Sequence, residues 1–187
     1  MRRLLRLLSR YVRTVEVRPA RPEDLMDCVE MAYAACLEDG ERPSASMALA
    51  LETHLANVIG RTAAESAPPA LALLSVVAGE VTGMVCCALS GPEPHRQGLV
   101  CDGWLLYVKP EHRRVALPGG IWRPDPRSAL ALMRGVLAAA EHWGAAALRV
   151  TMNEAAEQHR RRYERNLGFK VAGAQRIYRL AMTPEGV

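Results

Sequence analysis

Chemistry-bearing side chains gather in the middle of the chain, where a strand-like run ends in a basic turn. The run at residues 99–108 is followed by Lys-Pro-Glu-His and then by Arg113 and Arg114. Gly119 and Gly120 come next, and a helix-forming segment starts soon after them. A strand, a basic loop and a helix N-terminus in this order present backbone N–H groups and positive charge to a phosphate. The pattern predicts an anion site, although a basic loop that only contacts solvent explains the same residues.

Asp102, inside the strand-like run, is the carboxylate best placed to act as a base. It follows Cys101 and precedes Trp104 by two positions. Partial burial among such side chains would strip water from the carboxylate and make it a stronger base. Because side chains alternate along a strand, residues 102, 104, 106 and 108 are expected to share one face. The alternative is a carboxylate at a strand start that accepts hydrogen bonds from nearby backbone N–H groups.

The hydrophobic pattern predicts an α/β scaffold with a mixed sheet to position these groups. The helix at residues 44–60 is expected to start at a Ser cap and to stop at Gly60. The resulting order is β-α-α-β-β-β-α-β-α-β. The expected strands are 15–18, 71–77, 81–89, 99–108, 146–152 and 174–182, and the expected helices are 23–37, 44–60, 128–143 and 155–166.

The composition favours a single domain, 15–187, behind a short basic arm, 1–14. The chain has 187 residues and a net charge of +4, and residues 1–13 carry five arginines and no acid. The remainder is close to neutral, so a nucleic-acid-binding surface is not indicated. No apolar run approaches the ~18 residues of a membrane-spanning helix.

The arm itself has an amphipathic pattern. Leu4, Leu8 and Tyr11 share one helical face, and Arg6 and Arg10 lie opposite. A helix that packs on its own domain, a protein partner or a second subunit fits this pattern, as does a helix on a membrane surface. We favour protein contact, because 13 residues form a marginal helix in isolation. An organellar transit peptide also fits the composition alone.

Cysteine and histidine spacing argues against a metal site. The five cysteines have no Cys-x-x-Cys spacing, and the five histidines show no metal-ligand pattern. Buried free thiols in a reducing compartment are expected instead.

Four segments, in order, resemble the GNAT superfamily of acetyl-CoA-dependent N-acetyltransferases. VRPARPEDL is similar to the family's first strand and helix start, and AGEVTGMVCCAL to its second and third strands. YVKPEHRR resembles the entry to its pyrophosphate loop, and LRVTMNEAAEQHRRRYERNLGF its fifth strand and fourth helix. The resemblance spans residues 15–182 and implies transfer of an acetyl or other acyl group from acyl-CoA to a primary amine.

The resemblance implies a binding site for acetyl-CoA as cosubstrate, without a metal. Backbone groups of Leu106, Tyr107 and Val108 would hold the thioester carbonyl and the pantetheine arm. Arg113 takes the first position of the pyrophosphate loop, where Arg114, Gly119 and Gly120 would assist. Asn153 matches the family's Asn-x-x-Ala pattern and would also contact the cofactor.

The resemblance also implies catalytic roles. Asp102 or water would take the proton of the attacking amine, and Tyr163 or solvent would protonate the departing thiolate. The chain departs from the family where Ala116 and Pro118 replace loop glycines, and Pro118 has no N–H. Tyr163 lies one residue earlier than usual, so Glu164 takes its position, and Tyr163 could equally be a core residue.

Two functions therefore stay open. The first is a cytoplasmic N-acyltransferase acting on a small-molecule or protein amine, which the strand edge and Asp102 favour. The second is a catalytically inactive GNAT-fold structural or assembly protein, for example a component of a complex or a phage particle, that docks through the Arg-rich arm. The irregular loop, the shifted Tyr163 and the arm favour the second.

Overall fold

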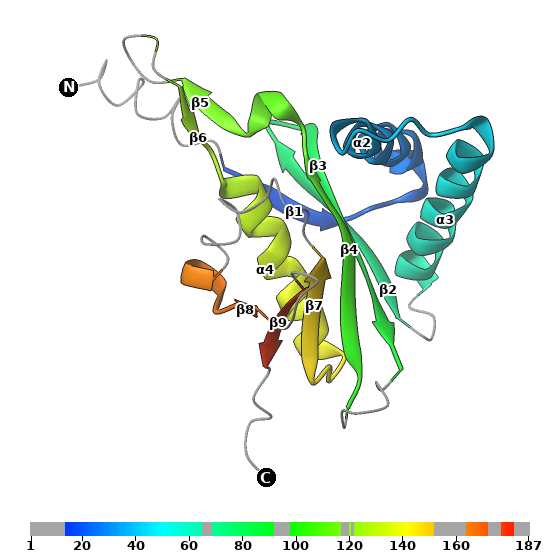
Figure 1. Ribbon diagram of the computed structural model, residues 1–187, viewed down its shortest axis with the longest axis vertical. Coiled ribbons are helices and arrows are strands. Elements are labelled where there is room, and N and C mark those ends of the chain that lie inside the picture. Colours follow the sequence, from blue (N-terminus) through cyan, green and yellow to red (C-terminus); the bar gives the residue numbers. More distant parts are fainter. Residues whose placement is uncertain are drawn as a thin grey trace.

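The computed structural model, which describes residues 14–64, 69–91, 98–116, 120, 122–151, 164–171 and 177–181, is built on one mixed sheet. Its strands lie in the order β1-β2-β3-β4-β7-β9-β8, and a second, small sheet consists of β5 and β6. Helices α2 and α3 cover one face of the large sheet and α4 covers the other (Figure 1). Among the described strand pairs, β4–β7 alone is parallel, and α4 is the crossover that joins these two strands.

The bounds of the elements confirm most of the predicted order. The strands are β1 Glu16–Pro19, β2 Ala70–Val77, β3 Glu80–Ser90, β4 Val100–Val108, β5 Arg114–Ala116, β6 Trp122–Pro124, β7 Ala147–Thr151, β8 Lys170–Val171 and β9 Ile177–Ala181. The helices are α2 Leu25–Glu38, α3 Ala45–Ala64 and α4 Arg127–His142, and the 3-10 turns are η1 Pro22–Asp24 and η2 Pro110–His112.

The structure differs from the prediction at four elements: β5, β6, β8 and α3. The irregular loop after β4 folds as the β5–β6 hairpin, and β8 precedes the last strand. Helix α3 does not stop at Gly60 but continues to Ala64, because Val58 and Ile59 are buried and the Thr62 hydroxyl accepts a hydrogen bond from the Ala72 N–H of β2. Of the predicted helix 155–166, only the last residues are described, and they belong to a helical turn over 164–167.

Two apolar cores, one on each face of the sheet, hold the layers together. On the α4 face, Leu132, Met133 and Val136 are fully buried against β3 and β7. On the opposite face, Leu55 of α3 and Met31 of α2 are buried against β2 and β3. Each such side chain contributes about 1.5–3 kcal/mol of burial free energy, so both faces of the central strands are fixed.

The entry to α2 is fixed by a buried carboxylate. Asp24 accepts two hydrogen bonds from the Arg18 guanidinium, at 2.6 and 2.8 Å, and a third from the backbone N–H of Arg21 at 2.8 Å. The Arg18 contact holds the pKa of the Asp24 carboxyl below its ordinary value. Since Arg18 lies on β1, this cluster ties the first strand to the first helix.

The five cysteines are free thiols, as predicted. Cys28, Cys86, Cys87 and Cys101 are buried, and Cys36 is half-buried. Burial raises the pKa of the Cys28 thiol to about 12. These thiols therefore pack as small apolar side chains.

Candidate active site

The defining feature of the site is the point at which β4 and β7 part. Their parallel pairing runs from Val100–Ala147 to Gly103–Val150, whereas β4 continues to Val108. Among the described residues, 104–108 of β4 have no β-strand partner on their β7 side; we call this stretch the open edge. A strand edge without a partner offers backbone N–H and C=O groups to a ligand.

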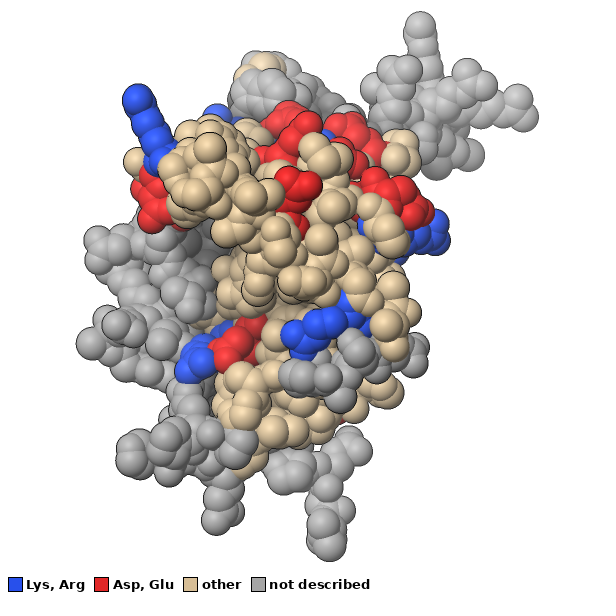
Figure 2. Space-filling view, turned by 90° about the vertical axis from the view of Figure 1, so that its right-hand side faces the viewer, with Lys and Arg blue, Asp and Glu red and all other residues tan. Residues whose placement is uncertain are grey.

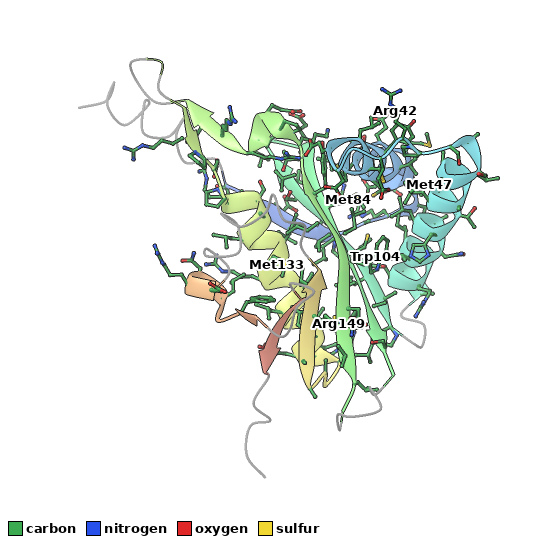
Figure 3. The ribbon with its side chains drawn as sticks, in the orientation of Figure 1. Arg42, Met47, Met84, Trp104, Met133 and Arg149 are labelled. Atoms are coloured by element: carbon green, nitrogen blue, oxygen red, sulfur yellow. The ribbon has the colours of Figure 1, made fainter. Side chains whose placement is uncertain are left out.

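A β-bulge at Trp104 begins the open edge. Cys87 on β3 pairs with Gly103, but the neighbouring Cys86 pairs with Leu105, so Trp104 is the extra residue. Its ring lies edge-on to that of His54 on α3, with centroids 4.7 Å apart, and it extends from β4 toward α3 (Figure 3).

The bulge corrects the predicted strand face. Asp102 and Trp104 face α3, but Leu106 and Val108 pack in the core on the α4 side. The expectation that residues 102, 104, 106 and 108 share one face is therefore wrong, because an inserted residue shifts the two-residue alternation by one.

The three predicted backbone-binding residues of β4 do not all point their N–H and C=O groups to the same side. The N–H of Lys109 donates to Thr82 on β3, and the carbonyl of Tyr107 faces Gly83 on the same strand. Because alternate residues point to the same side, the backbone groups of Leu106 and Val108 face away from β3, into the open edge. The backbone N–H and C=O groups of Tyr107 thus face β3. Those of Leu106 and Val108 face the open edge, where a ligand could form hydrogen bonds with them.

Asp102 lies beside the point of separation and is held by two side chains. The Arg149 guanidinium on β7 donates hydrogen bonds to both carboxylate oxygens, one of them at 2.8 Å. The Ser90 hydroxyl of β3 donates to the same carboxylate at 2.6 Å. About a quarter of each charged side chain is exposed. Asp102 is half-buried as predicted, but the groups that hold it are side chains of neighbouring strands.

Arg113, the predicted start of a pyrophosphate loop, packs against α2. It donates two hydrogen bonds to the Glu38 carboxylate, at 2.8 and 3.0 Å, and its Nε donates to the carbonyl of Val108. Its guanidinium also lies 4.9 Å from the ring centroid of Tyr107, whose hydroxyl donates to Glu38. Burial raises the pKa of the Tyr107 phenol, and the Glu38 charge adds to the effect. Arg113 therefore joins the end of β4 to the end of α2.

The carboxylate of Asp125 lies at the N-terminus of α4. Asp125 accepts a hydrogen bond from the backbone N–H of Arg127, at 3.1 Å, and pairs with the Arg127 guanidinium. The backbone N–H of Asp125 donates to the carbonyl of Arg113, which closes the base of the β5–β6 hairpin. Arg114 begins β5, and Gly120 lies exposed near the hairpin turn with a φ of +75°.

The remaining predicted site residues, Tyr163, Asn153 and Gly119, lie outside the described residues, as does the arm at 1–13. Within the described part, Glu80, Glu111 and His112 form a group with metal-ligand atoms within 4.8 Å of one another. Both acids are exposed, and His112 faces Glu80 at 3.6 Å. In the same part of the chain, no helix is long and apolar enough to cross a membrane.

Comparison with solved structures settles the architecture. A transcriptional regulator from Bacillus halodurans aligns with a TM-score of 0.63 at 16% identity, over 86% of this chain and 96% of that one. The PaiA N-acetyltransferase of Thermoplasma acidophilum, in complex with coenzyme A, aligns with a TM-score of 0.61 at 17% identity, over 89% and 96%. A GNAT family acetyltransferase of Brucella melitensis, in complex with acetyl-CoA, aligns at 0.57 and 19%, over 94% and 92%.

The chain has the GNAT fold. At these identities the likeness concerns the fold. No protein-family model matches the sequence, and no curated protein matches it. The GNAT architecture expected from the four sequence segments is thus confirmed by structure alone.

Three contacts around the candidate site of this GNAT-fold chain were missed by the sequence analysis. Glu38, Asp125 and Arg149 each bind a residue of the predicted site or its loop. Glu38 and Arg149 reach partners 75 and 47 positions away along the chain, which no local pattern reveals. Asp125, directly before Pro126 and two residues before a helix, could have been noticed as a helix-capping carboxylate.

Proposed function

We propose that this protein is an N-acyltransferase that moves an acetyl group, or another acyl group, from acyl-CoA to a primary amine. The open edge of β4 carries this proposal: Leu106 and Val108 direct backbone groups into the gap between β4 and β7. The PaiA and Brucella structures with the same fold contain coenzyme A and acetyl-CoA, respectively. An extended pantetheine arm can bind such an edge as an added strand does.

The backbone N–H groups of the open edge would bind the acyl donor. The N–H groups of Leu106 and Val108 would donate to the thioester carbonyl and to the amide groups of the arm, which stabilises the oxyanion of the tetrahedral intermediate. The Val108 carbonyl is occupied by Arg113, so the binding groups lie upstream of it. Holding both reactants at one edge would supply much of the rate.

Asp102 would attract and orient the amine on the α3 side of the sheet. The Asp102 carboxylate is about a quarter exposed, so an amine could bind to it and pass a proton through it to water. The neutral amine would then attack the thioester carbonyl and form the C–N bond of the tetrahedral intermediate. As the intermediate collapses, the C–S bond breaks, the nitrogen gives up a second proton to water, and the departing thiolate takes a proton from solvent or from Tyr163.

The test is transfer itself, measured as release of the coenzyme A thiol with a set of amines that includes free amino acids, polyamines and N-terminal peptides. We expect amine-dependent release that falls at least tenfold in Asp102→Asn and is unchanged in Glu141→Gln, an exposed carboxylate on α4. No amine-dependent release over the whole set, with mass spectrometry showing no acylated product, would count against the proposal.

A second candidate, a non-catalytic GNAT-fold structural or assembly protein, is favoured by one observation. The Asp125 carboxylate stands at the N-terminus of α4, where a phosphate would otherwise bind. Failure of acetyl-CoA to bind the native chain at millimolar concentration would select this candidate.

A further inference from the structure

Helix α2 exposes an apolar stripe that no other described element covers. Met26, Tyr33 and Leu37 lie seven and four positions apart, on one helical face, and are 61%, 36% and 50% exposed. The same helix buries Cys28 and Met31 on its inner face, so the stripe is additional to the face that packs on the sheet. We call these three residues the α2 stripe.

Negative charge surrounds the α2 stripe. Residues 22–41 contain seven acids and no Lys, Arg or His. Acidic side chains gather at the α2 end of the face in Figure 2. Asp24 is buried with Arg18 and Glu38 is paired with Arg113, and the other exposed acids are Glu23, Asp27, Glu30, Asp39 and Glu41. An apolar stripe among acids calls for an occupant that is apolar on one side and strongly basic on the other.

The chain contains one segment with that chemistry, the arm at residues 1–13. The arm carries five arginines and no acid, and its apolar face includes Leu4, Leu8 and Tyr11. As a helix it would be about 20 Å long, and the α2 stripe spans about 17 Å from Met26 to Leu37. The arm therefore matches the α2 stripe in length and apolar character, and its positive charge is opposite to the charge around the stripe.

The course of β1 favours a second copy as the partner. The chain enters β1 at Glu16 and leaves it at Pro19 toward α2, so residue 14 lies at the end of β1 remote from that helix (Figure 1). The arm therefore joins the described chain at the end of β1 that is remote from its own α2. Two copies related by a two-fold axis can instead exchange arms, which makes two equal contacts.

We infer that the Arg-rich arm of one copy docks as an amphipathic helix on the α2 stripe of a second copy, forming a reciprocal dimer. Leu4, Leu8 and Tyr11 cover the apolar side chains, and the arginines face the acids at the rim. Because an isolated helix of this length is marginal, the arm gains its structure from the contact. This contact is independent of the acyltransferase proposal.

Charge-exchanged full-length chains test the arrangement by sedimentation velocity. The native chain is expected to be a dimer that dissociates as salt is raised. One variant reverses the arm: Arg6→Glu, Arg10→Glu and Arg13→Glu. The other reverses the rim of the α2 stripe: Asp27→Lys, Glu30→Lys and Glu41→Lys. Each variant alone is expected to be a monomer, and an equimolar mixture is expected to restore the dimer, because only unlike chains have complementary contacts.

A matched control reverses three exposed acids on other elements: Glu16→Lys, Glu80→Lys and Glu141→Lys. This chain should remain a dimer, and circular dichroism should show native helix content in all variants. A native chain that stays monomeric at every concentration overturns the inference, whether or not it binds anionic vesicles. A mixture of the two folded variants that stays monomeric overturns it as well.

Discussion

The carboxylate of Asp102 on β4 accepts hydrogen bonds from the guanidinium of Arg149 on β7, one residue before the pairing of the two strands ends at Gly103. This ion pair therefore closes the paired part of the two strands and stands at the start of the open edge. It fixes the separation of β4 and β7 at the position where the proposed reactants would meet.

Arg149→Gln should weaken this junction. The substitution leaves the half-buried Asp102 carboxylate with Ser90 as its partner, and we expect a loss of about 1–2 kcal/mol in the free energy of unfolding. Urea unfolding of Arg149→Gln, Asp102→Asn and the double variant measures the coupling. If the two single losses simply add, the pair does not hold the strands together.

Gly83→Ala should destabilise the sheet behind the open edge. A Cβ at this position would lie 2.6 Å from the carbonyl oxygen of Tyr107 and 3.1 Å from the Cα of Val108, so β3 and β4 must move apart. We expect a loss of about 2–4 kcal/mol. Gly60→Ala is the matched control: it is exposed on α3 with nothing within 4 Å, and should stabilise by about 0.5–1 kcal/mol. Equal changes in thermal stability for the two variants would contradict the close approach of β4 to β3 at Gly83.

Asp125→Asn should increase affinity for acetyl-CoA. The substitution removes a negative charge from the N-terminus of α4, where the backbone N–H of Arg127 and its guanidinium could then attract a phosphate. We expect a dissociation constant about two- to fivefold lower by calorimetry, from a helix-terminus interaction of about 0.3–1 kcal/mol. Glu141→Gln should leave the constant unchanged. If Asp125→Asn bound acetyl-CoA more weakly than the native chain, the pyrophosphate would not bind at the N-terminus of α4.

Asp24→Asn should reduce stability in a pH-dependent way. The Arg18 contact lowers the pKa of Asp24 in the folded chain, so its stabilisation is fully present above the ordinary Asp value of about 4 and is lost as the pH falls through the lower, folded value. Losing charged hydrogen bonds costs about 1–3 kcal/mol near neutral pH, and the gap between native chain and variant should close in acid. Asp27→Asn, on the exposed face of α2, should show no such gap in denaturant unfolding.

The sequence predicts the elements of this fold better than the contacts between them. The strands around Asp102 and the helix after the basic turn follow from local hydrophobic periodicity, which packing on both faces of the sheet reinforces. The bulge at Trp104 escapes such reasoning, because one inserted residue leaves the pattern apolar and changes only its register. Arg113 lies in the turn after β4, but its partner Glu38 comes from a distant helix that only the folded chain brings near.

Amide hydrogen exchange with and without acetyl-CoA, followed residue by residue, tests the central claim most directly. The account predicts that acetyl-CoA slows exchange at the N–H groups of Leu106 and Val108, which face the open edge. The N–H of Tyr107, which faces β3, serves as the internal control and should change much less. Unchanged exchange at Leu106 and Val108 in millimolar acetyl-CoA would contradict the claim that this edge binds the acyl donor.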